Sequence, residues 1–273
     1  MLQVKYACKM PNQPAPLGVR PVCAFTDNYI WLIESPRVPT RVVAIDPGDG
    51  APVRAELERS GSSLAAILLT HHHADHIGGV AALLELGAVP VVGPEDSRIP
   101  QRTQTVRDGE RCELPDLGLS FDILHVPGHT LTHIAFWGHG ALFCGDTLFS
   151  AGCGRMFEGT PRQMHASLNR LGGVPPDTQM YCGHEYTAAN LRFALNVDPE
   201  NADALEYRER VARLRAADVP SLPSRMAVEL RVNPFLRCEA AVVRAAAEAH
   251  AGGPLRQPYE VFRVLRAWKD KFH

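Results

Sequence analysis

Four of the chain's 12 histidines fall within six positions of the segment Thr70–His76, which reads Thr-His-His-His-Ala-Asp-His. The apolar run of residues 64–69 precedes the segment and predicts a buried strand. Helical periodicity resumes over residues 77–86, so the segment itself is expected to form a tight loop between strand and helix. Such a loop can direct the first and third histidines to one side and the aspartate and last histidine to a neighbouring point. Imidazole and carboxylate groups without a thiolate suit zinc, and also iron or manganese. The predicted metal ligands of this segment are His71, His73, Asp75 and His76.

Three further ligand candidates, His129, Asp146 and His184, recur in one kind of context. Each follows a predicted strand, over residues 119–126, 141–144 and 180–182 respectively, and is preceded by a glycine. The ends of strands are where α/β folds present chemistry. A loop of solvated histidines would explain the first cluster alone. It would not explain three more polar residues at strand ends, so we interpret all seven residues as one metal site.

The clustered residues match in full the H-x-H-x-D-H signature of the metallo-β-lactamase superfamily, which the chain therefore resembles. The resemblance implies an αββα sandwich with its site at one edge of the two sheets. It also implies two divalent metal ions, zinc in the first instance, and such a pair activates a bridging water for hydrolysis. The implied ligands are His71, His73 and His129 for one ion and Asp75, His76 and His184 for the other, with Asp146 bridging. Asp75 and Asp146 would then serve catalysis as ligands that position the bridging hydroxide.

The amino-acid composition of the sequence changes beyond Tyr186. Four stretches rich in Ala, Arg and Glu show helical periodicity and are separated by proline-containing breaks. We expect a mixed α/β catalytic domain over residues 1–190, of which residues 1–21 form an extension, and a helical substrate-binding domain over residues 191–273. The predicted helices are Thr187–Leu195, Asp203–Ala217, Cys238–His250 and Pro258–Phe272.

Motifs outside the metal ligands resemble glyoxalase II, the hydroxyacylglutathione hydrolases. The resemblance runs from about Ala24 onward and continues into the helical region, which other branches of the superfamily lack. It implies hydrolysis of S-D-lactoylglutathione and related 2-hydroxyacylglutathiones to D-lactate (or the related acid) and glutathione. The motifs are Asp146–Phe149, Gly152–Arg155, Phe157–Gly159, Cys182–Thr187, Asn233–Arg237 and Arg266–Asp270.

The same resemblance implies four substrate-binding residues. Arg155 and Tyr186 would contact the peptide backbone of glutathione, and Arg266 and Lys269 would hold its glycine carboxylate. The last two lie three positions apart in a predicted helix, within residues 256–273, where five Lys or Arg stand against two Asp or Glu. Where many family members carry tyrosine, this chain has Phe157, so one hydroxyl contact to glutathione is lost and affinity should be lower.

Three other functions compete with the thioesterase. A persulfide dioxygenase resembles the chain around His71, His73 and His129 but uses one iron. The presence of Asp75, His76 and His184, which can hold a second metal, disfavours it. A lactonase of the same fold would lack the helical region. A non-catalytic metal-binding module is disfavoured because all seven ligand candidates are intact.

The composition of the chain limits which binding partners and which cellular compartment are expected. A net charge of −2 gives no sign of nucleic-acid binding, and no apolar run approaches the ~20 residues of a membrane helix. Seven scattered cysteines without a C-x-x-C pair fit a reducing compartment. We therefore expect a cytoplasmic monomer whose partner is a small glutathione thioester.

Overall fold

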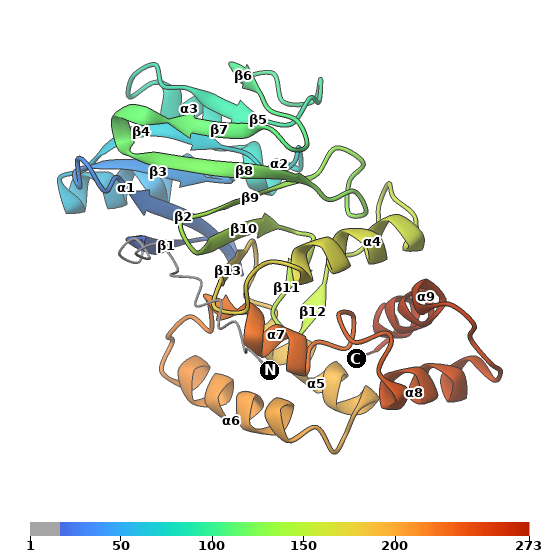
Figure 1. Ribbon diagram of the computed structural model, residues 1–273. Helices are drawn as coiled ribbons and strands as arrows, with labels where there is room; N and C mark the ends of the chain where they lie inside the picture. Colours follow the sequence, from blue (N-terminus) through green and yellow to red (C-terminus); the bar gives the residue numbers. More distant parts are fainter. Residues whose placement is uncertain (1–16, 273) are drawn as a thin grey trace, which may run out of the picture.

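The computed structural model describes residues 17–272, and within them two six-stranded sheets form the centre of the molecule. Figure 1 shows these sheets together, with the helices of the C-terminal third on one side of them. In spatial order the first sheet contains β1 (Val19–Ala24), β2 (Asn28–Glu34), β3 (Arg41–Ile45), β4 (Ser63–Leu68), β5 (Val91–Gly93) and β6 (Gln104–Thr105). The second contains β14 (Ser224–Arg225), β13 (Gln179–Cys182), β10 (Ala141–Gly145), β9 (Ile134–Gly138), β8 (Leu119–His125) and β7 (Arg111–Leu114).

The main hydrophobic core draws on both sheets. It includes Trp31 of the first sheet together with Phe121, Phe136 and Phe143 of the second, all of them fully buried. In β8 the side chains alternate between buried and partly exposed, which is the pattern of a strand with one covered face. Each fully buried aromatic or branched side chain contributes about 1.5–3 kcal/mol relative to an exposed one. This shared core holds the two sheets together.

Helices cover the outer faces of the sandwich. α1 (Gly50–Ser60) and α3 (Val80–Leu84) pack on the first sheet through a second apolar cluster that includes Val53 and Leu83. α4 (Pro161–Gly172) contributes Met164 and Leu168 to the main core. The αββα sandwich predicted from the sequence is thereby confirmed.

The C-terminal third is helical, as predicted. Its helices are α5 (Thr187–Val197), α6 (Ala202–Ala216), α7 (Met226–Val232), α8 (Ala241–Ala251) and α9 (Pro258–Lys269). Phe193, Phe235 and Phe262 pack in the core beneath them, and Glu260 completes a capping box at the start of α9. The four predicted helices correspond to α5, α6, α8 and α9, whereas the helical periodicity of the sequence did not predict the short helix α7.

Two local expectations are wrong. The predicted extension of residues 1–21 is too long, because Val19–Ala24 pairs with β2 and Arg20 forms an ion pair with Glu34; residues 1–16 lie outside the described part. The helix expected over residues 77–86 is broken into α2 (Ala74–Ile77) and α3. At the break, a Cβ on Gly79 would lie 2.3 Å from the backbone nitrogen of Gly50, so close packing against α1 requires glycine.

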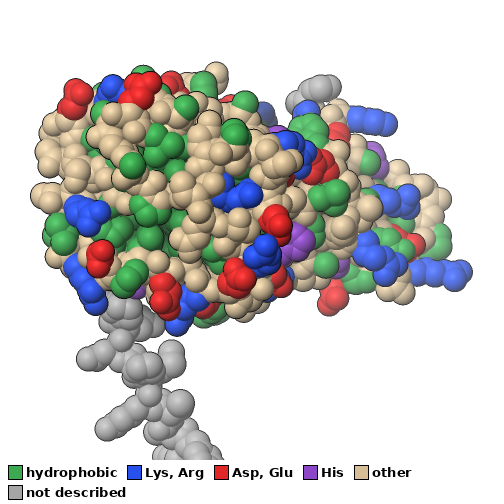
Figure 2. All heavy atoms as spheres, turned by 90° about the horizontal axis from the view of Figure 1, so that it is seen from above, with side chains coloured by type: hydrophobic (Ala, Val, Ile, Leu, Met, Phe, Trp, Pro, Cys, Tyr) green, Lys and Arg blue, Asp and Glu red, His purple; other side chains and the backbone are tan. Residues whose placement is uncertain are grey.

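The described helices and one face of the molecule bear on membrane and nucleic-acid binding. Across residues 17–272, none of the helices is long and apolar enough to cross a membrane. On the face drawn in Figure 2, Lys and Arg side chains are interspersed with Asp and Glu. The predictions of a cytoplasmic monomer that does not bind nucleic acid stay predictions.

Candidate metal centre and substrate pocket

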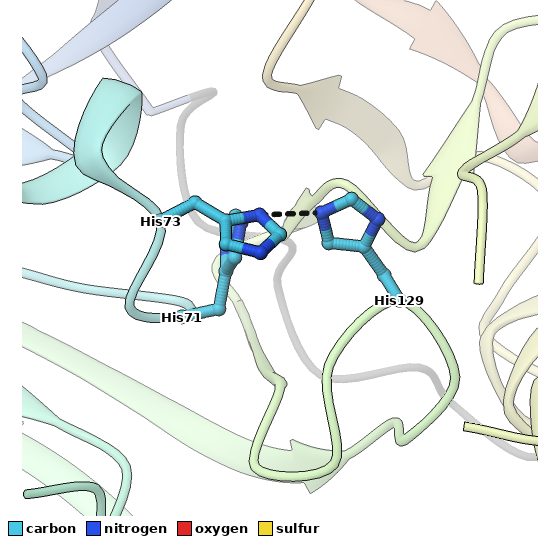
Figure 3. Close-up of side chains that lie close together, drawn as sticks. All are labelled: His71, His73 and His129. Atoms are coloured by element: carbon cyan, nitrogen blue, oxygen red, sulfur yellow. Dashed lines mark hydrogen bonds between the residues drawn. The ribbon is translucent and has the colours of Figure 1, made fainter. Parts of the chain in front are cut away.

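Three histidines converge at one edge of the sandwich (Figure 3). The end of β4 leads into the loop that carries His71 and His73, and the loop after β8 carries His129. Nδ1 of His73 lies 3.1 Å from Nε2 of His71 and 2.9 Å from Nε2 of His129. Three ring nitrogens that face one another at this range have their lone pairs directed at a common point, which is the arrangement a cation requires.

The pKa values in this group fit a ligand role. Burial holds the pKa of His71 well below its usual range, and the neighbouring imidazoles of His76 and His133 add to the effect. Burial, followed by His129, lowers the pKa of His73 to about 4. Burial also lowers the pKa of His129. Neutral imidazoles are the form that binds metals, so the protein keeps this group ready for an ion.

A second group lies beside the first and contains Asp75, His76 and His184. One ligand atom from each of these residues lies within 4.8 Å of the other two. Burial opposes protonation of His184, but hydrogen bonds to Asp146 and Asp75 outweigh it and raise the pKa of His184 to about 10. Burial likewise opposes protonation of His76, yet Asp146 and Asp46 raise its pKa well above the usual range. Carboxylates therefore dominate the electrostatics of this group, as a divalent cation requires.

Asp146 lies between the two groups. Its Oδ2 is 3.6 Å from Nε2 of His129 and 3.3 Å from Nε2 of His184, and its Oδ1 is 3.4 Å from Nε2 of His76. Nε2 of His76 and Oδ1 of Asp146 are buried polar atoms without a hydrogen-bond partner. Leaving such atoms unsatisfied costs about 1–3 kcal/mol each. A cation at this point would satisfy both, so the residues present fit a metal centre.

Outer partners hold most of these imidazoles in place. Nδ1 of His184 lies 2.8 Å from Oδ1 of Asp27, and Nδ1 of His129 lies 2.8 Å from the carbonyl oxygen of Arg155. Such partners fix the ring orientation and the tautomer of a metal-binding histidine. Sequence reasoning missed Asp27, although an aspartate just before the apolar run of residues 29–33 is a weak signal for a residue at a sheet edge.

Asp46 supports both groups at once and was also missed. Its carboxylate accepts hydrogen bonds from the backbone N–H and the hydroxyl of Thr70, at 2.7 and 2.6 Å, and Nδ1 of His76 lies 3.1 Å away. The Thr70 hydroxyl lies 3.0 Å from Nδ1 of His71. Because the hydroxyl donates to Asp46, it accepts from His71 and leaves Nε2 of that ring free for a ligand.

Two histidines outside the predicted ligand set, His72 and His133, lie close to the centre. His72 faces the carboxylates of Asp96 and Glu158, at 3.4 and 3.6 Å, and not the metal groups. His133 is fully buried and stacks on His71 with ring centroids 4.5 Å apart. Its Nε2 accepts a hydrogen bond of 3.2 Å from the backbone N–H of Asp146. His133 is thus a packed residue that also supports the centre.

A cavity of about 510 Å³ opens beside the centre and extends to the helical region. This is a common size for a pocket that takes a small organic ligand. Its walls combine the metal-site residues His129 and Asp146 with side chains from β11 (Leu148–Phe149), β12 (Gly152–Cys153), α5 and α9. The lining includes all four predicted substrate-binding residues, Arg155, Tyr186, Arg266 and Lys269, as well as Phe157.

These four side chains differ in their freedom to bind a ligand. Arg155 is exposed, and the ring of Tyr186 stacks on His184 at 4.8 Å, where burial raises the pKa of its hydroxyl to about 12. Arg266 is 3% exposed. Its two terminal nitrogens donate to the carbonyl of Cys153 at 2.8 Å and to Asp270 at 3.0 Å, and its Nε is buried. Burial lowers the pKa of Lys269 to about 8. Lys269 is therefore the cation of the pair that remains available.

The sandwich and its histidine–aspartate centre define a protein of the metallo-β-lactamase fold. The sequence model of the metallo-β-lactamase superfamily matches residues 25–184, and the model of the hydroxyacylglutathione hydrolase C-terminus matches residues 185–272. The chain belongs to the hydroxyacylglutathione hydrolase family of this superfamily, which confirms the resemblance read from its motifs.

Similar proteins span nearly the whole chain. A hydroxyacylglutathione hydrolase of Pseudomonas paraeruginosa is 54% identical over 91% of this chain and 97% of its own length. One of Nitrosomonas eutropha is 45% identical over 94% of this chain and 99% of its own. Among solved structures, the ETHE1 protein of Myxococcus xanthus superposes with a TM-score of 0.63 at 25% identity, covering 92% of this chain and 90% of that one. TTHA1623, solved in a di-iron-bound form, has a TM-score of 0.58 at 28% identity over 80% of this chain and 100% of its own.

Proposed function

We propose that this chain hydrolyses the thioester bond of S-D-lactoylglutathione and of related 2-hydroxyacylglutathiones, releasing the 2-hydroxy acid and glutathione. The observation that carries the proposal is one cavity whose wall combines His129 and Asp146 of the metal centre with Arg155, Tyr186 and Lys269. The names of the relatives at 45–54% identity support this substrate class.

The metal ligands are part of the proposal. His71, His73 and His129 would hold one divalent ion, and Asp75, His76 and His184 would hold a second. Asp146, which lies near His129 and also near His184, would be the ligand that the two groups share. We propose zinc, which nitrogen and oxygen donors bind readily, although the same donors also accept iron or manganese. When bound, such ions polarise a carbonyl and ionise a water near neutral pH.

The chain's own residues would place the substrate. The ammonium group of Lys269 would pair with the glycine carboxylate of glutathione, while Arg155 and Tyr186 line the path between that end and the centre. In this position the acyl group lies toward His129 and Asp146. Placing the thioester there lowers the entropic part of the barrier.

The acyl half of the substrate has fewer partners than the tripeptide half. The exposed ring of Phe157 lies edge-on to His73 and His129, with centroid distances of 5.5 and 5.2 Å. A flat apolar surface discriminates weakly between small acyl groups. We therefore expect turnover of several 2-hydroxyacyl groups, and turnover of only one would contradict this expectation.

The direct test follows the loss of thioester absorbance from S-D-lactoylglutathione, with purified protein before and after chelation. Rapid loss that stops on chelation and returns on addition of zinc supports the proposal. If metal-replete protein leaves the thioester intact, the proposed substrate is wrong. Persulfide oxidation is then the next activity to measure.

A further inference from the structure

A two-stranded hairpin links the metal centre to the substrate pocket. The hairpin of β11 and β12 spans residues 148–153. It follows Asp146 closely in the chain and precedes Arg155 and Phe157. Phe149 and Cys153 of the hairpin line the cavity themselves. Its position therefore sets the spacing between the metal-binding end of the pocket and the glutathione-binding end.

Side chains from the helical region hold this hairpin by its backbone. Nδ2 of Asn233 donates to the carbonyl of Phe149 at 3.1 Å and to that of Gly152 at 2.9 Å, so one amide spans both strands. Asn190 donates to the carbonyl of Ser150 at 2.9 Å. With the Arg266 contact to Cys153 described above, four hairpin carbonyls are held by side chains of α5, α9 and the residue that ends α7.

Glu229 of α7 holds the turn of the hairpin from the other side. It is fully buried, and it accepts hydrogen bonds from the backbone N–H of Ala151 at 2.7 Å and from the hydroxyl of Ser150 at 2.8 Å. Ala151 has a φ of 54°, a left-handed conformation that costs a non-glycine residue about 1 kcal/mol or more. A buried carboxylate that receives hydrogen bonds in this turn offsets that strain. Such contacts fix the turn in one conformation.

We infer that Glu229 and Asn233 are positioning residues for substrate binding, which act on the pocket through the hairpin and touch neither substrate nor metal. The helical region thus has two tasks, since it supplies side chains to the pocket and also fixes the shape of the pocket wall that belongs to the sandwich. The inference rests on the proposed function, because the ligand it concerns is the glutathione half of the thioester.

The contacts of Glu229 make a conservative rescue possible. A glutamine keeps one oxygen for the N–H of Ala151, and its amide nitrogen faces the hydroxyls of Ser150 and Ser224, which can accept as well as donate. Glu229→Ala removes all of these bonds. The pair of variants separates loss of the contacts from loss of the charge.

Asn201 provides a matched control in the same region. It caps α6 through Ala204 and donates to the carbonyl of Arg231 at the end of α7, but makes no contact with the hairpin. Asn201→Ala should lower the melting temperature and leave substrate binding unchanged. This variant measures how a general loss of stability in the helical region affects substrate binding.

The experiment measures kcat and KM for S-D-lactoylglutathione, and the affinity for the thioether S-methylglutathione by calorimetry. Asn233→Ala and Glu229→Ala should raise KM and weaken thioether binding about tenfold or more, with kcat within about threefold and the metal content unchanged. Glu229→Gln should return KM to within about threefold of wild type. Should either alanine variant fail to fold, Ser150→Ala removes only the hydrogen bonds of this hydroxyl to Glu229 and Tyr207, and should raise KM about threefold.

Two results would overturn the inference. One is an unchanged KM in Asn233→Ala despite a lower melting temperature, and the other is an equal rise of KM in Asn201→Ala. Wild-type protein that does not hydrolyse the thioester would reject the proposed function instead. Failure of the two proposals is therefore distinguishable.

Discussion

The carboxylate of Asp46 lies 3.1 Å from Nδ1 of His76, on the side of the ring that faces away from the metal-binding groups. The same oxygen accepts from the Thr70 hydroxyl at 2.6 Å. An acceptor in this position keeps the proton on Nδ1 and leaves Nε2 of His76 free to bind an ion. One carboxylate thus sets the tautomer of a proposed ligand directly, and that of His71 through Thr70.

Asp46→Asn should therefore weaken metal binding by about 10–100-fold. The amide nitrogen would donate to Nδ1 of His76 and move the ring proton to Nε2, where the ion must bind. Equilibrium dialysis against a series of chelator concentrations, with metal analysis of the protein, measures the change. Asp49→Asn is the control, because Asp49 caps α1 through Ala51 and asparagine caps a helix equally well. Equal metal affinity in both variants would contradict the role of Asp46.

Asp146→Ala should abolish turnover and reduce the metal content below that of wild type. The side chain lies between the two proposed groups, near His129 and His184, and its loss leaves no shared ligand. His73→Ala should have the same effect, since its Nδ1 lies between two imidazoles. Metal analysis and thioester hydrolysis together test this prediction.

The neighbouring His72 supplies the control for both variants. His72→Ala should keep kcat within about fivefold of wild type, because its ring faces Asp96 and Glu158. Retention of kcat in Asp146→Ala would exclude a mechanism that needs both metal-binding groups.

The sequence was most informative where strands end. The apolar run of residues 119–126 predicted β8 almost to the residue, and the glycine-flanked His129 that follows it lies in the centre. Because buried and partly exposed side chains alternate along β8, its sequence shows the alternation of apolar and polar residues that predicts a strand. All seven residues predicted as ligands come together for the same reason, since each stands where a buried strand or its loop reaches the same edge.

The supporting contacts could not be predicted in this way. Asp46 occupies an ordinary Asp-Pro-Gly turn, and its partners lie 24 and 30 positions further along the chain. α7 has seven residues, too few for periodicity to show, and its Glu229 is fully buried although a glutamate in a helix normally faces solvent. Such residues are defined by contacts distant in sequence, which pattern alone does not record.

Phe157→Tyr should lower KM for S-D-lactoylglutathione by about twofold to tenfold without changing kcat. The Phe157 side chain is 65% exposed at the wall of the cavity, so a hydroxyl added there meets ligand or solvent without crowding the core. One hydrogen bond to bound ligand is worth about 0.5–1.5 kcal/mol. Phe157→Leu, which lacks a hydroxyl, is the control and should not improve KM. An unchanged KM in the tyrosine variant would show that glutathione does not reach this position.

Alkaline pH should weaken substrate binding through Lys269. Burial lowers the pKa of this ammonium group to about 8, and the nearby Arg266 adds to the effect, as does Arg192, whereas Cys153 and Asp270 oppose it. Below pH 8 the group is charged and can pair with the glycine carboxylate. As pH rises through about 8 the charge is lost, and kcat/KM, which reports the free enzyme, should fall about tenfold per unit well above that pH.

Lys269→Arg separates this cause from other titrations. A guanidinium stays protonated throughout the accessible range, so the alkaline decline should move to higher pH in this variant. A substrate whose glycine carboxylate is amidated should show little decline with wild-type protein, because it lacks the group that the charge attracts. The measurement is kcat/KM between pH 6 and about 9.5, corrected for spontaneous thioester hydrolysis. The same decline in Lys269→Arg and wild type would assign the titration to another group and remove Lys269 from the carboxylate site.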